Sequence, residues 1–148
     1  MKRCLLIWMA ALLLLSNGCA FKVKNKSFSI NVDAVTSITF QKKYENEEGT
    51  AYYQEKVVTD QKNIRSICKK IQNMPLTRAD SSVPQPIKEV SYVVIIKSET
   101  KHHLILNEEK AFYDQVAYEY VSDKTYREFA KLYESLNSEE KEAPADLY

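Results

Sequence analysis

The clearest pattern in the chain is a stripe of apolar positions in its middle. Isoleucine and cysteine recur at three- and four-residue spacing, with lysine and arginine between them, as on a helix that buries one face. Thr59 and Asp60 offer an N-terminal cap, and the segment Asn73-Met74-Pro75 ends the run. We therefore expect an amphipathic helix whose inner face carries Ile64, Ile67, Cys68 and Ile71.

A second stripe of this kind follows a cap at Ser122 and Asp123. Its inner face consists of Tyr126, Phe129, Ala130, Tyr133 and Leu136. Residues 138–148 then carry four acidic residues against one lysine, and we expect them to be a disordered acidic tail.

Period-two alternation predicts strands in the remaining chain. The first three are expected at residues 28–34, 37–42 and 50–58, the last two joined by a polar turn at 45–49. After a polar loop over 76–86, the apolar run 87–97 is typical of a central strand buried on both faces. Two further strands are expected at 102–107 and 111–121.

This order of elements predicts an α+β fold over residues 28–137. We expect an antiparallel sheet of about five or six strands with the two amphipathic helices packed on one face. About 110 ordered residues bury roughly two thirds of the unfolded surface, which is enough for a stable core.

The N-terminal residues have the three-part pattern of an export signal. Lys2 and Arg3 precede an apolar run from Leu5 to Leu15, and small residues follow it. The run spans about 16 Å as a helix, about half of the hydrocarbon thickness of a bilayer, so we do not expect a permanent transmembrane helix. We expect residues 1–18 to be a signal peptide.

Gly18 and Cys19 resemble the end of a bacterial lipobox, which implies cleavage between them and acylation of Cys19. The lipobox of bacterial lipoproteins prefers Leu three residues before the cysteine and Ala or Ser two residues before it. Here those two positions hold Ser16 and Asn17. Two alternatives remain open: signal peptidase cleavage after Ala20, which gives a secreted protein, and an unmodified Cys19 thiol. Acylation would leave residues 19–27 as a tether and the protein outside the cytoplasm, anchored to the cell membrane.

Charge and composition narrow the function classes. The whole chain has a net charge of +1, and loss of Lys2 and Arg3 leaves 19 basic against 20 acidic residues. That balance argues against a nucleic-acid partner. Two glycines leave no room for a Gly-rich phosphate loop, so no cofactor is expected.

Candidate catalytic groups are few. His102 and His103 are adjacent, so on a strand their rings point to opposite faces and cannot share a metal. Cys68 lies on an apolar stripe, which favours a buried thiol over a nucleophile. Paired carboxylates fall in turns or in the tail, and no hydrolase, zinc or nucleotide motif occurs. We therefore expect neither an enzyme nor a metal site.

Tyrosines supply the remaining candidate binding surface. If one sheet face stays uncovered, Tyr113, Tyr118 and Tyr120 would be exposed there and suited to binding. The competing interpretation is that tyrosine fills strand positions because of its β-propensity.

The leader, the segment VVTDQKNIRSICKKIQNM, the hairpin SYVVIIKSETKHHLIL and the segment YVSDKTYREFAKLYESL resemble the small YhfM-like lipoproteins of Gram-positive bacteria. The resemblance implies an envelope lipoprotein domain and supplies no catalytic residues. Together these observations favour a non-enzymatic binding domain, with the lipid membrane and another envelope protein as its partners. The alternatives are an inhibitor or immunity-type protein acting on an envelope enzyme, and a secreted hydrolase with an unrecognised site.

Overall fold

The computed structural model describes residues 28–79 and 89–144 and has the predicted α+β architecture. Its sheet is antiparallel and has eight strands instead of five or six, in the order β3-β7-β6-β5-β4-β1-β2-β8. The elements are η1 Val32–Ala34, β1 Ser37–Glu45, β2 Ala51–Val58, α2 Gln61–Gln72, β3 Leu76–Arg78, β4 Tyr92–Lys97, β5 Lys101–Leu106, β6 Lys110–Tyr113, β7 Val116–Tyr120, α3 Lys124–Glu134 and β8 Lys141–Glu142.

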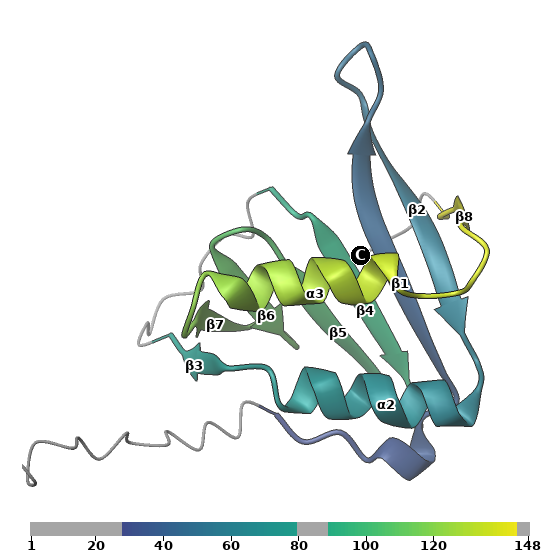
Figure 1. Cartoon of the computed structure of the whole chain (residues 1–148), viewed down its shortest axis with the longest axis vertical. Helices are drawn as coiled ribbons and strands as arrows, with labels where there is room; N and C mark the ends of the chain where they lie inside the picture. Colours follow the sequence, from purple (N-terminus) through teal and green to yellow (C-terminus); the bar gives the residue numbers. More distant parts are fainter. Residues whose placement is uncertain (1–27, 80–88, 145–148) are drawn as a thin grey trace, which may run out of the picture.

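Both helices lie side by side across one face of the sheet (Figure 1). The core is the layer between them and the sheet, because every second strand residue points towards the helices. On the central strands this face carries Phe40, Val94, Ile96, Leu104 and Leu106, all fully buried. Val93, on the other face of β4, is also fully buried, as the continuous apolar run predicts.

The two helices begin and end close to where the sequence predicts. Asp60 accepts a side-chain hydrogen bond from the Asn63 amide at the start of α2, and the four predicted stripe residues are buried. In α3, Phe129 and Tyr133 are buried as predicted, while Thr125 and Leu132 are buried in addition. Tyr126, Ala130 and Leu136 pack at the margin of the core.

The predicted first strand, residues 28–34, is wrong. This segment contains η1 and runs along α2, where the Gln72 side chain donates a hydrogen bond of 2.9 Å to the Ile30 carbonyl. Arg65 of α2 forms an exposed ion pair with Asp33. The alternating pattern reflects contact of Phe28 and Ile30 with the core, without any strand partner for this segment in the described sheet.

The predicted strand 111–121 is instead a hairpin of β6 and β7. Its two-residue turn places Asp114 at φ 45° and Gln115 at φ 72°, the left-handed conformation that such a tight turn needs. Glycine or asparagine normally signals this turn, so Asp-Gln gave little indication of it. The polar loop prediction over 76–86 also changes, because Leu76–Arg78 forms the edge strand β3.

The acidic segment 138–148 differs from the predicted disordered tail over residues 138–144. Lys141 and Glu142 pair with β2 as strand β8, and the Ala143 amide donates to the Tyr53 carbonyl. A strand of two residues is below the length at which sequence patterning is detectable, which explains why the pairing was missed.

Candidate functional site

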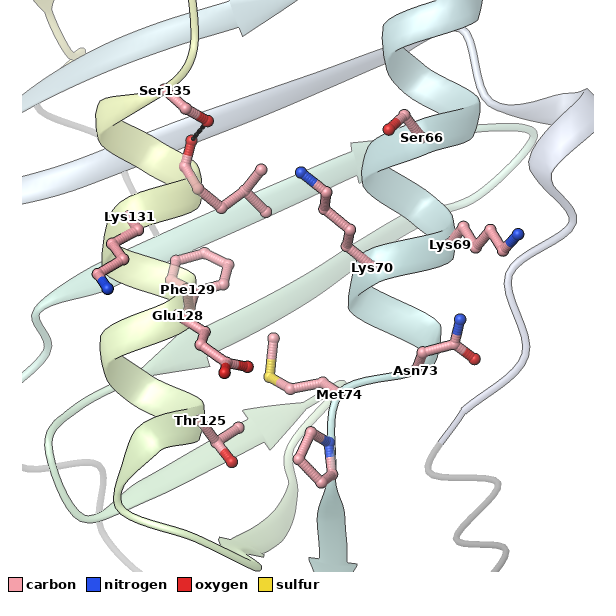
Figure 2. A pocket seen from close by; sticks show the side chains of 12 residues that line it. Ser66, Lys69, Lys70, Asn73, Met74, Thr125, Glu128, Phe129, Lys131 and Ser135 are labelled. Atoms are coloured by element: carbon pink, nitrogen blue, oxygen red, sulfur yellow. Dashed lines mark hydrogen bonds between the residues drawn. The ribbon is translucent and has the colours of Figure 1, made fainter.

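A groove of about 730 Å³ lies between α2 and α3 on the outer side of the helix layer (Figure 2). Its floor is apolar and consists of Met74, Phe129 and Leu132, whose side chains belong to the core. Both helices use their apolar stripes to contact the sheet, so polar side chains are left on their outer sides. Lys70 and Glu128 point into the space between the helices, whereas Lys69 and Lys131 point away from it (Figure 2).

Thr125 supplies an unusual polar atom in this groove. The residue is 2 % exposed and lines the groove at its α3 wall, and its hydroxyl has no hydrogen-bond partner among the described residues. Leaving a buried hydroxyl unpaired costs about 1–3 kcal/mol. The oxygen itself has almost no accessible surface, so it is a buried unpaired group of the α3 wall and not a donor presented to the groove.

The rim of the groove is mainly basic. Lys69 and Lys70 reach it from α2 and Lys131 from α3, while Glu128 is the one carboxylate that lines it. All four side chains are exposed. The groove therefore combines an apolar floor with a mainly basic rim, a combination that suits an anionic group with a small apolar part.

A second cavity of about 720 Å³ lies at the ends of β1, β4 and β5 and is more polar. Its lining includes Glu108 and Glu109, one of the carboxylate pairs that the sequence places in turns, together with Glu45 and Glu89. Within the described residues, no three or more His, Cys, Asp and Glu side chains gather to form a metal site.

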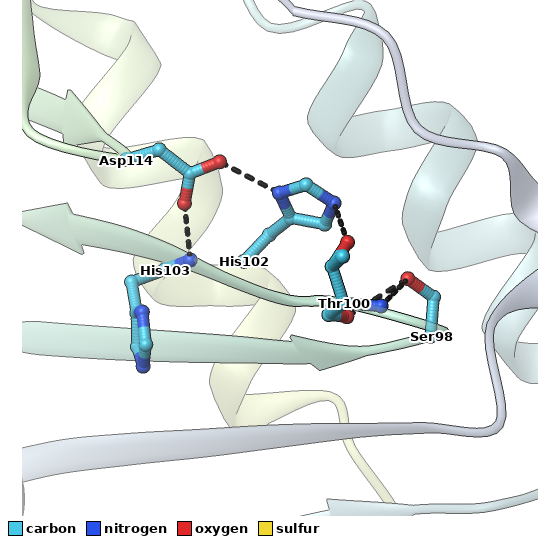
Figure 3. Close-up of polar contacts among 5 residues, drawn as sticks. All are labelled: Ser98, Thr100, His102, His103 and Asp114. Atoms are coloured by element: carbon cyan, nitrogen blue, oxygen red, sulfur yellow. Dashed lines mark hydrogen bonds and ion pairs between the residues drawn. The ribbon is translucent and has the colours of Figure 1, made fainter.

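The two histidines point to opposite faces of β5, as predicted (Figure 3). Nδ1 of His102 lies 2.6 Å from Oδ2 of Asp114, and Nε2 lies 3.0 Å from Oγ1 of Thr100. The other Asp114 oxygen accepts a hydrogen bond of 2.9 Å from the His103 backbone amide.

The tautomer that fits donates from Nδ1 to the carboxylate and accepts at Nε2 from the Thr100 hydroxyl. Such a hydroxyl–imidazole–carboxylate series is the arrangement used to activate a nucleophile. None of its three residues lines the groove or the second cavity, and Asp114 lies in the β6–β7 turn with a positive φ. The contacts explain how this turn is held.

The predicted tyrosine surface is wrong for two of its three members. Tyr113 and Tyr118 point towards the helices and are 8 % and 7 % exposed. Tyr113 stacks on Phe28 at a ring distance of 4.1 Å, and burial, aided by the nearby Asp114, raises the pKa of Tyr113 to about 12. Tyr120 is half-buried, and its hydroxyl donates to the Asn107 and Lys110 carbonyls. Because the helices cover this sheet face, the tyrosines form core and not a binding surface.

A polar cluster at the other end of the helix layer fastens the C-terminal segment. Oε1 of Glu140 accepts hydrogen bonds from Tyr133, at 2.5 Å, and from Tyr44, at 2.8 Å. Burial and the Glu140 carboxylate raise the pKa of Tyr133 above its usual value. The buried Lys56 ammonium lies 4.7 Å from the centre of the Tyr133 ring.

Cys68 lies in the core and is fully buried, in agreement with the prediction. Burial raises the pKa of its thiol, which disfavours the nucleophilic thiolate. The predicted cleavage site at Gly18 and Cys19, the signal peptide and the tether lie outside the described residues. Among the helices that the structure describes, none has the length and apolar character needed to cross a bilayer.

The sequence interpretation missed the groove and Thr125. The available signal was the charge of the first helix, which carries four basic residues and no acidic one. Comparisons of the chain with protein-family models, curated proteins and solved structures found no match. The resemblance to small lipoproteins stays a prediction. The geometry of α2 and α3 is the structural observation that bears on function.

Proposed function

We propose that this protein is a membrane-anchored bacterial envelope lipoprotein whose globular part is a non-enzymatic binding domain. The leader pattern supports export, and Cys19 at the end of its apolar run supports acylation. An acylated Cys19 places the domain outside the cytoplasm and next to the membrane surface. The binding surface is the groove between α2 and α3.

The groove is the observation that carries the binding role. It presents an apolar floor and a mainly basic rim on the side of the helix layer that faces away from the sheet. The floor residues are already packed against the core, so the groove is preformed and a ligand does not have to open it.

The anchor is tested by the intact mass of the protein extracted from membranes with detergent, beside a Cys19→Ser variant. We expect a chain that begins at Cys19 and carries acyl mass, and we expect this species to disappear in the variant. A chain that begins at Phe21 with no added mass would instead identify a secreted protein and contradict the anchor.

Occupancy of the groove is tested in intact cells with a photoreactive amino acid. Asn73 lines the groove, and Glu99 is also an exposed position, in the β4–β5 turn. We expect adducts from position 73 and none from the matched position 99. Equal labelling at both would contradict a binding groove, and one discrete protein adduct would favour the inhibitor interpretation.

A further inference from the structure

The helix layer, defined here as α2 and α3, is the basic part of an otherwise acidic domain. The α2 helix carries four basic residues and no acidic one, and α3 carries three basic and two acidic residues. The layer thus has a net charge of about +5, although the chain from Cys19 onwards has a net charge of about −1. The positive charge is concentrated on one face.

Ion pairs neutralise little of this charge. Arg65 is paired with Asp33, and Glu134 is paired with Lys42 of β1. Six exposed cations of the layer have no described ion pair, against the single carboxylate Glu128: they are Lys62, Lys69, Lys70, Lys124, Arg127 and Lys131. A partner for this face is therefore anionic.

The chain enters the domain beside this face. Phe28 packs on the helix-covered side of the sheet, and the next residues run along α2 through the contacts of Ile30 and Asp33. Phe28 lies nine positions after Cys19, which limits their separation to about 30 Å at 3.3–3.6 Å per residue. An acyl anchor on Cys19 would keep Phe28, which packs on the side of the sheet that the helix layer covers, within that distance of the bilayer.

We propose that the helix layer docks on the headgroups of anionic phospholipids and holds the domain against the membrane that anchors it. The placement next to the anchor rests on the proposed function, whereas the affinity of the layer for the headgroups does not. In this arrangement Lys70, which points into the space between the helices, and the outward-facing Lys131 contact the headgroups (Figure 2).

The magnitudes fit reversible docking. Each basic residue close to an anionic leaflet contributes about 1 kcal/mol, and the attraction decays within a Debye length of about 8–10 Å. The groove floor is buried within the domain, so little apolar surface is available to insert into the bilayer. The docking is therefore electrostatic and sensitive to salt. An acidic protein would also complement this charge. The membrane is the favoured partner because an acylated Cys19 would hold the bilayer close to this face, whereas no feature of the chain would hold an acidic protein there.

The test uses the unacylated chain of residues 20–148, which contains every described residue and the whole core. Its partition is measured by flotation with vesicles of phosphatidylcholine alone and vesicles with one third phosphatidylglycerol. One variant reverses two groove lysines, Lys70→Glu with Lys131→Glu. A matched control, Lys97→Glu with Lys101→Glu, makes the same charge change at the β4–β5 turn. Thermal unfolding confirms that each variant folds.

We expect binding only to the anionic vesicles, a steep decrease with salt, and a loss of at least about tenfold in the groove variant. The control should lose less than about threefold. Equal binding to both vesicle types, equal loss in both variants, or no vesicle binding would overturn the proposal. Vesicle binding by a protein that carries no acyl mass in cells would contradict only the proposed anchor. Acyl mass without vesicle binding would contradict only the proposed docking surface.

Discussion

The Tyr133 hydroxyl of α3 donates a hydrogen bond of 2.5 Å to Oε1 of Glu140, which lies just before the edge strand β8. The same oxygen accepts from Tyr44 of β1. One carboxylate thus joins a helix, a central strand and the C-terminal segment. The hydrogen bond from Tyr133, together with that from Tyr44 and the charges of Lys56 and Lys42, lowers the pKa of Glu140 below its usual value despite partial burial.

The first prediction concerns acid stability. Because its folded pKa is lowered, Glu140 stabilises the fold above its usual pKa of about 4.5, and this contribution is lost as the pH falls through the lowered value. Glu140→Gln should therefore flatten the decline of the unfolding free energy below about pH 4.5. Denaturant titration across this range measures the slope.

Glu142→Gln is the control, since its side chain is exposed on β8. Amide hydrogen exchange at Ala143 should accelerate in Glu140→Gln, because weaker hydrogen bonds to Tyr133 and Tyr44 would let the pairing of β8 with β2 open more often. An unchanged acid slope together with unchanged exchange would contradict this role of Glu140.

The second prediction concerns the β6–β7 turn. Asp114 accepts hydrogen bonds from the His103 amide and from the His102 ring, and it adopts φ 45°. Asp114→Ala removes both acceptors and places a residue with little tolerance for this conformation, so we expect a loss of about 1–3 kcal/mol. Asp114→Asn keeps an oxygen acceptor and tolerates the conformation, so it should lose less. Urea unfolding compares them, and equal losses would show that the side-chain contacts do not hold the turn.

The turn also shows where sequence patterning stops. Helical periodicity located both helices. All four stripe residues predicted for α2 are buried. In α3 only Phe129 and Tyr133 of the predicted stripe are buried, because the buried face is turned towards Thr125 and Leu132. A continuous apolar run located β4. The turn at Asp114-Gln115 could not be predicted, because contacts of Asp114 with His102 and His103 on a neighbouring strand support its left-handed conformation. The tyrosines were misplaced for the same reason, because the register of β6 and β7 decides which face they take.

The groove could not be predicted from the sequence for a different reason. The charges of α2 were visible, but the groove depends on how far apart two helices lie on a shared sheet. Nothing local to residues 61–72 or 124–134 fixes that separation. In the sequence, Thr125 is an ordinary polar helix position next to a cap. Only the structure shows that the residue is buried and that its hydroxyl is unpaired.

The third prediction follows from that hydroxyl. Thr125→Val keeps the shape of the side chain and removes the unpaired polar atom, so the unfolding free energy should rise by about 1 kcal/mol. Thr125→Ser keeps the hydroxyl and loses a methyl group, so it should be less stable than the parent. Thermal and denaturant unfolding of the ligand-free chain measure both. A stability loss in Thr125→Val would mean that the hydroxyl already has a partner in the folded state.

The fourth prediction concerns Cys68, the one cysteine of the chain of residues 20–148. Its side chain is fully buried between α2 and the sheet, and burial raises the pKa of the thiol. A thiol reagent should therefore react with the folded protein only at the rate at which the core opens, and at once in denaturant. The control is an exposed cysteine placed at Ser66 in a Cys68→Ala background, which should react quickly in the folded state. Rapid reaction of Cys68 under native conditions would mean that the contact between α2 and the sheet opens easily. The groove floor could not then be rigid, because Phe129 and Leu132 belong to the same core.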